Sequence, residues 1–178
     1  MKYCSKCGSG NLEFKIPADD SLKRFCCQEC DSIFYTNPNL IVGALCMWED
    51  KILLAKRNIQ PRHGLWTLPA GFMENAETMR EGAAREVYEE TLASIELLQP
   101  YTAFSLTHIS QVHFFYLANL KTLEFGPTPE SQEVELFEEK DIPWKEIAFP
   151  TVTKTLEYFY QDRKSGNFDF REEDIKLF

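Results

Sequence analysis

The sequence predicts an α/β protein, an α/β/α sandwich on a mixed sheet that is preceded by a small cysteine-bearing unit. Two cysteine pairs lie near the N-terminus, apolar runs of strand length bracket a central acidic helix, and a second helical pattern follows near the C-terminus. A chain of 178 residues has room for one main domain and a small addition. We expect the small unit at residues 1–36 and the main domain at residues 37–178.

The composition is typical of a soluble globular protein, with 44% hydrophobic and 26% charged residues. A net charge of −9 disfavours proteins that follow nucleic-acid phosphates, because such proteins depend on lysine and arginine clusters. No apolar run approaches the length that spans a bilayer, and the N-terminus lacks the features of a signal or transit peptide. We therefore expect a cytoplasmic protein with no membrane or nucleic-acid partner.

The N-terminal cysteines form two matched pairs, Cys4-x-x-Cys7 and Cys27-x-x-Cys30, with a spacer near the length typical of four-cysteine zinc sites. Four thiolates in a tetrahedral array suit Zn²⁺ and leave no open position, so the site would be structural. Cys26 competes with Cys27 at a spacing one residue wider, and we prefer Cys27 because two matched pairs make the simpler site.

The segment between the two pairs reads as two short strands around a turn at residues 17–20, which together make a zinc ribbon. An iron–sulfur cluster or a redox dithiol is the alternative use of these cysteines. Cys46 lies in an apolar strand and is expected in the core.

The boundary to the main domain is expected at residues 36–39, because the residue before Pro38 avoids the helical region. A buried strand at 40–48 and a second at 51–57 then form a hairpin. Further strands are expected at 65–71, 94–106, 111–120 and 134–139.

A central helix is expected from Glu77 to about Thr91, with Ala84, Val87 and Thr91 packed on the sheet. Pro150 begins a second helix that Gly166 ends. The last stretch, residues 167–178, reads either as a strand or as an arm on a neighbouring subunit.

The central helix carries three carboxylates on one face. Glu86, Glu89 and Glu90 stand at positions i, i+3 and i+4, so they lie within one turn and repel one another. A hard divalent cation such as Mg²⁺ turns this repulsion into binding. A solvated acidic helix face is the alternative interpretation.

The spacing around this face is specific. Five residues separate Gly71 from Glu77, seven separate Glu77 from Arg85, and Glu86 follows directly. This pattern resembles the signature of the Nudix hydrolases, which cleave a nucleoside diphosphate linked to another group. The resemblance implies a Nudix sandwich fold, Mg²⁺ (or Mn²⁺) bound by the three helix glutamates, and a pair between Glu77 and Arg85 that braces the loop. It also implies that the carbonyl of Ala70 or Gly71 completes the metal shell.

One position departs from the family pattern, which has glycine where this chain has Leu92. That glycine ends the helix in a left-handed conformation, which raises the energy of a non-glycine residue by roughly 1–2 kcal/mol. We therefore expect the helix to end differently here.

The family also places a further acidic residue beyond the helix, as a metal ligand or general base. Glu130, Glu133 and Glu135 are the candidates, and we choose Glu133 because it precedes the apolar strand. An ordinary surface glutamate is the alternative.

Three more side chains are candidates for substrate binding. Arg57 would meet a phosphate, and Trp66 and Phe72 would stack a nucleobase or flavin ring. Solvation of Arg57 and packing of the two rings are the alternatives. The histidines His63, His108 and His113 are expected to be structural.

The zinc-ribbon members of the family include NADH pyrophosphatases, which carry a stretch of the SQPWP type where this chain has SLTHISQVHFF. The ribbon, the linker YTNP, the stretch NIQPRHGLWTLPAGF, the acidic helix motif and the later stretches GPTPES, ELF and IPW follow one another in this chain. In this combination the chain is similar, over nearly its whole length, to the plant chloroplast FAD pyrophosphatases. The resemblance thus implies Mg²⁺-dependent hydrolysis of FAD to FMN and AMP, or of ADP-ribose, by a possible homodimer. The alternatives are a non-catalytic, nucleotide-sensing regulator with a Nudix-like domain and, more weakly, RNA decapping.

Overall fold

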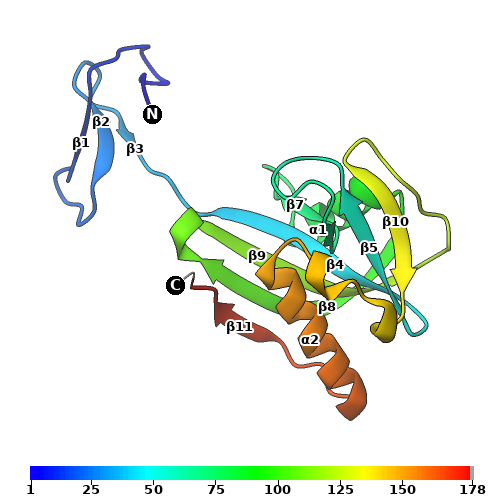
Figure 1. Ribbon diagram of the computed structural model, residues 1–178. Coiled ribbons are helices and arrows are strands. Elements are labelled where there is room, and N and C mark those ends of the chain that lie inside the picture. The colour runs from blue at the N-terminus through cyan, green and yellow to red at the C-terminus, as the bar shows by residue number, and fades with distance from the viewer. Residues whose placement is uncertain (177–178) are drawn as a thin grey trace. The chain divides into compact units, whose positions relative to one another are not determined.

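The computed structural model describes residues 1–176 of the chain. It contains two compact units, Met1–Asn37 and a second that begins at Pro38 (Figure 1). Within the described residues, no helix is long and apolar enough to cross a membrane.

The first unit is a small antiparallel sheet of three strands, β1 (Leu12–Lys15), β2 (Arg24–Cys27) and β3 (Ile33–Phe34). The turn between β1 and β2 has Asp19 in the left-handed region, with φ 64°. Phe14 and Phe25 face each other across the two strands with ring centroids 4.9 Å apart. The two predicted strands are confirmed, and β3 is an addition to them.

The second unit is built on a mixed sheet of eight strands. They are β4 (Asn39–Trp48), β5 (Lys51–Arg57), β6 (Trp66–Thr67), β7 (Ala70–Phe72), β8 (Ile95–Leu106), β9 (Gln111–Leu120), β10 (Ser131–Phe137) and β11 (Arg171–Asp174). The order across the sheet is β10-β5-β4-β9-β8-β11, with β6 paired to β5 and β7 to β4. The pairs β4–β9 and β8–β11 are parallel, and the other pairs are antiparallel.

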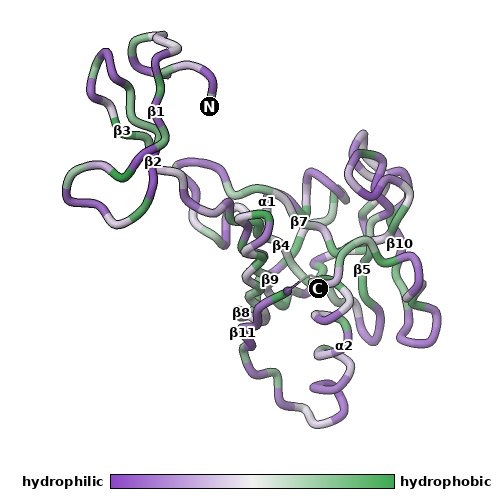
Figure 2. The backbone as a smooth tube through the Cα atoms, turned by 60° about the vertical axis from the view of Figure 1, so that its left-hand side comes forward, coloured by the Kyte–Doolittle hydropathy of each residue, from purple (hydrophilic) through white to green (hydrophobic). Residues whose placement is uncertain are grey.

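Two helices, α1 (Met79–Thr91) and α2 (Pro150–Ser165), cover opposite faces of this sheet (Figure 1). Successive residues of β4 point to opposite faces. Leu45 packs in one cluster with Leu156 of α2, whereas Ala44 and Cys46 pack in another with Val87 of α1. The α/β/α sandwich and the core position of Cys46 are therefore confirmed. Figure 2 shows that the central strands are apolar along much of their length and the loops hydrophilic.

Short 3-10 turns complete the unit at Thr107–Ile109, Glu139–Asp141 and Trp144–Glu146.

Helix α1 begins two residues later than the sequence predicts. Thr78 is its N-cap: the Thr78 hydroxyl accepts from the Glu81 backbone N–H at 3.2 Å, and the Glu81 carboxylate accepts from the Thr78 backbone N–H at 2.8 Å. This reciprocal cap satisfies two N–H groups that the helix cannot bond itself. Glu77 therefore lies before the helix, in the loop. Ala83, rather than the partly buried Ala84, lies fully in the core beside Val87 and Thr91.

The expectation that α1 ends differently at Leu92 is wrong. Leu92 itself adopts the left-handed conformation, with φ 61°, and its N–H donates to the Tyr88 carbonyl at 2.7 Å. Its side chain is 48% exposed, so it contributes little packing. The helix keeps the family's ending and carries the backbone strain.

We expect Leu92→Gly to raise the free energy of unfolding by about 0.5–1 kcal/mol, because glycine removes the left-handed penalty but adds entropy to the unfolded chain. Urea denaturation measures this. Leu92→Ala is the matched control, since it keeps the β-carbon. Equal stability of the glycine and alanine variants would show that backbone strain is not the cause.

The C-terminal segment, left open by the sequence, forms a strand in the chain's own sheet. Gly166 ends α2 in the left-handed region with φ 74°, and β11 then runs parallel to β8. Residues 177–178 of the predicted segment lie outside the described part of the chain.

Candidate active site and cysteine site

The first unit brings together the sulfur atoms of Cys4, Cys7, Cys27 and Cys30. All four lie within 4.8 Å of one another, with Cys4 Sγ 3.7 Å from Cys30 Sγ and Cys7 Sγ 3.6 Å from Cys27 Sγ. Four thiolates at the Zn–S distance of about 2.3 Å stand about 3.8 Å apart in a tetrahedron. The group therefore fits a tetrahedral ion such as Zn²⁺. It is the only set of three or more cysteine, histidine or acidic side chains in residues 1–176 whose ligand atoms lie this close together.

The structure also decides between the two neighbouring cysteines. Cys26 is buried away from the group, with its Sγ donating to the Arg24 carbonyl at 3.7 Å. Hydrogen bonding to Ser32 lowers the pKa of the Cys30 thiol to about 6, which favours the thiolate that a metal binds.

We expect Cys27→Ser to lose bound zinc and to unfold the first unit, because binding energy at such a site is folding energy. Cys26→Ser is the matched control and should keep one zinc per chain. Zinc content by metal analysis, with circular dichroism, distinguishes the two. Retention of zinc by Cys27→Ser would contradict this assignment.

The second unit has an acidic pocket of about 420 Å³. Five glutamates line it: Glu86, Glu89 and Glu90 from α1, Glu74 from the loop before α1, and Glu130 from the segment before β10. The pocket also includes β7, the start of β9 and the start of α2. The helix face predicted from sequence therefore opens into a cavity that contains two further carboxylates.

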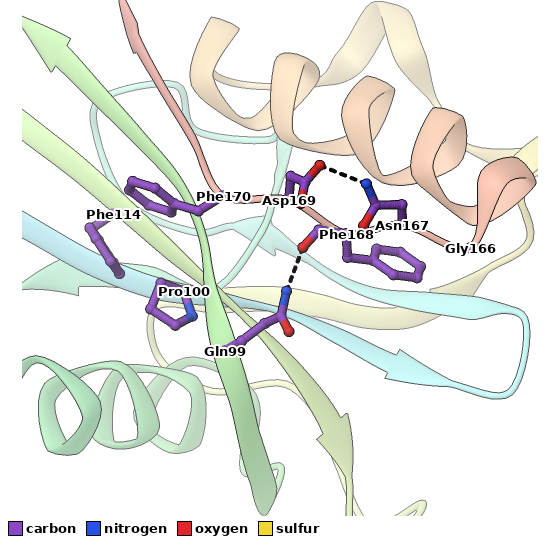
Figure 3. Close-up of a pocket in the computed structure, with 8 residues that line it drawn as sticks. All are labelled: Gln99, Pro100, Phe114, Gly166, Asn167, Phe168, Asp169 and Phe170. Atoms are coloured by element: carbon purple, nitrogen blue, oxygen red, sulfur yellow. Dashed lines mark hydrogen bonds between the residues drawn. The ribbon is translucent and has the colours of Figure 1, made fainter.

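A second hollow, of about 740 Å³, lies between β8 and the segment that joins α2 to β11 (Figure 3). Its polar groups bond within the hollow: Gln99 Nε2 donates to the Phe168 carbonyl, and Asn167 Nδ2 donates to Asp169 at 2.6 Å. None of the predicted site residues lines it. The Gln99 bond fastens the segment to the sheet, and no predicted site residue lies here, so the acidic pocket remains the candidate active site.

Burial sets the ionisation of two pocket glutamates. Glu90 is 5% exposed and accepts from the Ala70 N–H at 3.0 Å; burial raises its pKa to about 8. Burial also raises the pKa of Glu86, and the charge of Glu130 adds to the effect on both groups. A bound divalent cation would favour the charged forms. Both carboxyls are thus arranged to gain from a cation.

Glycine at position 71 leaves the space that a carboxylate occupies. A β-carbon built on Gly71 would clash with the carboxylate of Glu86. Glycine lets this carboxylate lie directly against β7, which fixes where the α1 glutamates meet the pocket. Position 82 is similar, because a β-carbon there would lie 2.6 Å from Glu77 Oε1.

Arg85 organises the carboxylates around it. Its Nε and Nη2 donate to the two oxygens of Glu77 at 2.9 and 2.7 Å, and Nη2 also donates to the Phe72 carbonyl at 3.1 Å. Its Nη1 donates to Glu86 at 2.7 Å and to Glu89 at 2.9 Å. One guanidinium therefore ties the loop to the helix and orients two pocket carboxylates.

The structure does not bring Glu133 into this pocket. Its carboxylate accepts from Lys56 Nζ at 2.8 Å, on the neighbouring strand β5, whereas Glu130 lines the pocket. The sequence named Glu130 as a candidate but offered no local signal to select it.

Of the three predicted substrate-binding residues, two lie at the pocket and one does not. Arg57 and Phe72 line the pocket, and Phe72 is 52% exposed. Trp66 is 5% exposed and packs edge-on against Phe137 with ring centroids 4.9 Å apart, so its ring belongs to the core. His113 lies at the pocket with both ring nitrogens hydrogen-bonded, and burial lowers its pKa to about 4.

The family profile described as NUDIX domain matches residues 37–162, and the zinc-ribbon profile described as Nudix N-terminal matches residues 2–36. The chain belongs to the Nudix hydrolase family. A crystal structure of a NUDIX hydrolase from Nitrosomonas europaea is 46% identical, with a TM-score of 0.96 over 99% of this chain and 100% of that one.

Two relatives with named activities are also similar to this Nudix hydrolase. The NAD-capped RNA hydrolase NudC of Photobacterium profundum is 32% identical over 71% of this chain and 46% of its own length. The ADP-ribose pyrophosphatase of Methanocaldococcus jannaschii is 42% identical over 32% of this chain and 34% of its own length. The chain spans about half the length, or less, of these curated relatives.

The pocket's donor set fits the divalent metal of Nudix enzymes. Its candidate ligands are carboxylate oxygens, which suit Mg²⁺ or Mn²⁺, and Glu86 and Glu90 lie against the same strand, β7. In residues 1–176 these carboxylate oxygens are not gathered as closely as the four thiols. Such ions, when bound, neutralise phosphate charge and lower the pKa of a water molecule. The chain's own contribution is to hold the carboxylates: Arg85 orients Glu86 and Glu89, and the Ala70 N–H orients Glu90.

Proposed function

We propose that this Nudix hydrolase cleaves the diphosphate bond of a nucleoside diphosphate derivative with the help of Mg²⁺ or Mn²⁺, and that its substrate is FAD or ADP-ribose. Water adds to one phosphorus, the bridging P–O bond breaks, and FAD yields FMN and AMP. The observation that carries this proposal is that five glutamates line one pocket, with Arg85 orienting two of them.

In this proposal the residue roles are those that the family resemblance implies, with one change. Glu86, Glu89 and Glu90 hold the metal, Glu77 and Arg85 brace the loop, and Glu130 replaces Glu133 as the further acidic group. Arg57 and Phe72 line the same pocket and are placed to meet phosphate and ring.

The N-terminal ribbon, in this proposal, is a structural Zn²⁺ domain that takes no part in the chemistry. Its four thiols leave no position open for a substrate.

Product analysis tests the function. Purified full-length protein with Mg²⁺ is incubated with FAD, ADP-ribose, NADH and an NAD-capped RNA, and the products are separated by chromatography. The capped RNA is included because relatives carry that activity in their names. Glu89→Gln removes one carboxylate at nearly constant shape and is the matched variant.

FMN and AMP from FAD, reduced at least about 100-fold in Glu89→Gln, would support both the chemistry and the substrate. Turnover of ADP-ribose, NADH or capped RNA without FAD would keep the chemistry and remove FAD. Nucleotide binding without any turnover would favour a nucleotide-sensing regulator instead.

A further inference from the structure

A chain of buried hydrogen bonds leads from helix α2 to the edge of the acidic pocket. Thr155 Oγ1 donates to the Thr151 carbonyl at 2.8 Å, and the Thr151 hydroxyl lies 3.1 Å from His113 Nδ1. The other ring nitrogen, Nε2, lies 3.1 Å from Gln111 Oε1. Thr151 and His113 are 0% and 8% exposed, whereas Gln111 lines the pocket. The chain therefore ends in a carboxamide at the cavity wall.

The direction of these bonds follows from the neutral ring. Burial lowers the pKa of His113 to about 4, so at neutral pH the ring carries one N–H. The oxygen of Gln111 only accepts, so Nε2 donates to it and Nδ1 accepts from the Thr151 hydroxyl. Within residues 1–176, the Gln111 amide nitrogen has no protein acceptor and is not a buried unpaired atom. Its donors are therefore free of protein partners in the described residues, on a side chain that lines the pocket.

An apolar wall stands beside this amide. The register places Phe72 of β7, Ile41 of β4 and His113 of β9 in one row across the sheet, and paired residues point to the same face. Phe72 and Ile41 line the pocket together with Gln111. An exposed aromatic face next to fixed N–H donors is suited to a heterocycle whose edge carries a hydrogen-bond acceptor.

We propose that Gln111 is a specificity-determining residue that donates to a ring acceptor of the nucleotide, and that His113 and Thr151 are positioning residues that fix its carboxamide. This inference rests on the proposed function, since it identifies which part of the substrate this end of the same pocket reads. It assigns the ring, rather than the diphosphate, to the wall of Phe72 and Ile41.

The test measures binding, so that it does not depend on turnover. Calorimetry on full-length protein carrying Glu89→Gln gives the Kd of AMP, of FMN and of ribose 5-phosphate, which has no ring. Gln111→Met keeps the length of the side chain without its donors, and Gln111→Glu replaces the donors with acceptors. Gln132→Met, at an exposed position on β10 outside the pocket, is the matched control.

We expect Gln111→Met to weaken AMP or FMN binding about tenfold and Gln111→Glu to weaken it more, with ribose 5-phosphate unchanged. Thr151→Val should weaken binding of the same mononucleotide, but to a smaller extent. In the active enzyme, which keeps Glu89, Gln111→Met should raise KM for the substrate that contains the affected mononucleotide and leave kcat within about twofold.

Unchanged Kd for both mononucleotides, or full affinity in Gln111→Glu, would overturn the inference. An equal loss for ribose 5-phosphate would assign the amide to the sugar phosphate and overturn it as well. If the wild-type chain turns over no substrate while Gln111→Met still loses AMP or FMN, the proposed function fails and this inference stands. If the wild-type chain turns over substrate while Gln111→Met binds AMP and FMN with unaltered Kd, the proposed function stands and this inference fails.

Discussion

Glu130→Gln is expected to lower kcat by about 10²–10⁴-fold, whereas Glu133→Gln leaves it within about twofold. This range of kcat loss is the one expected when an enzyme loses its general base. Glu130 lines the pocket, and its charge adds to the effect of burial in raising the pKa of Glu86 and Glu90, so it interacts electrostatically with both carboxyls. Glu133 is held by Lys56 on the neighbouring strand.

The two variants make a matched pair, since each replaces one carboxylate by an amide three residues from the other. Steady-state rates at saturating substrate, with a Mg²⁺ titration, separate two roles for Glu130. A loss that high Mg²⁺ restores identifies a metal ligand, and a loss that persists identifies a base. A larger loss in Glu133→Gln than in Glu130→Gln would return the role to the residue that the sequence favours.

The local part of the site was predictable from sequence because its chemistry lies within one loop and one helix. Helical spacing places Glu86, Glu89 and Glu90 on one face, and the loop that starts at Gly71 presents Glu77 to Arg85. The residues that make these contacts are close in sequence, within a stretch about as long as five helical turns. The apolar strands and the two amphipathic helices suggested the sandwich, and the family motif decided it.

The distant part was not predictable because it depends on strand register. The pairing of β10 with β5 shifts between Ser131 and Glu133, so Ser131 pairs with Arg57 and Glu133 with Lys56. Such an irregularity breaks the two-residue alternation that a sequence reading uses. It leaves Glu130, just before the strand, at the pocket. No local pattern in the sequence marks that shift.

Local energetic preferences of small magnitude can also lead to wrong predictions from sequence. The missing glycine at Leu92 suggested another helix end, but a penalty of roughly 1–2 kcal/mol is smaller than the packing that fixes α1 on the sheet. Trp66 was expected at the substrate for its ring, but pairing of β6 with β5 buries it against Phe137. In both cases tertiary packing outweighs a local rule.

Asp162→Ala is expected to lower the free energy of unfolding by about 3 kcal/mol. Asp162 is 4% exposed; both of its oxygens accept from the guanidinium of Arg171, and Oδ2 also accepts from the Tyr101 hydroxyl at 2.8 Å. Breaking a buried pair destabilises a protein by about 3–5 kcal/mol. Arg171 keeps 30% of its side chain exposed and can regain water, so we expect the lower end of that range.

Lys164→Ala is the control for charge alone. Lys164 lies 3.9 Å from Glu139, both side chains are largely exposed, and its loss should change stability by less than about 1 kcal/mol. Denaturant unfolding of the two variants, with Tm values, gives the comparison. Equal effects would mean that the Asp162 pair is no stronger than a surface contact.

The position of this pair gives it a structural consequence beyond its energy. Asp162 lies near the end of α2 and Arg171 begins β11, so the pair holds the last strand on β8 and covers that edge of the sheet. Loss of the carboxylate should therefore raise amide hydrogen exchange in β11 and β8 before it does so in β4. Removing both charges with Asp162→Leu and Arg171→Met should recover part of the stability, because an apolar pair leaves no buried charge unpaired. Failure of the double variant to recover any would show that the hydrogen-bond geometry, rather than the unpaired charge, is what the strand needs.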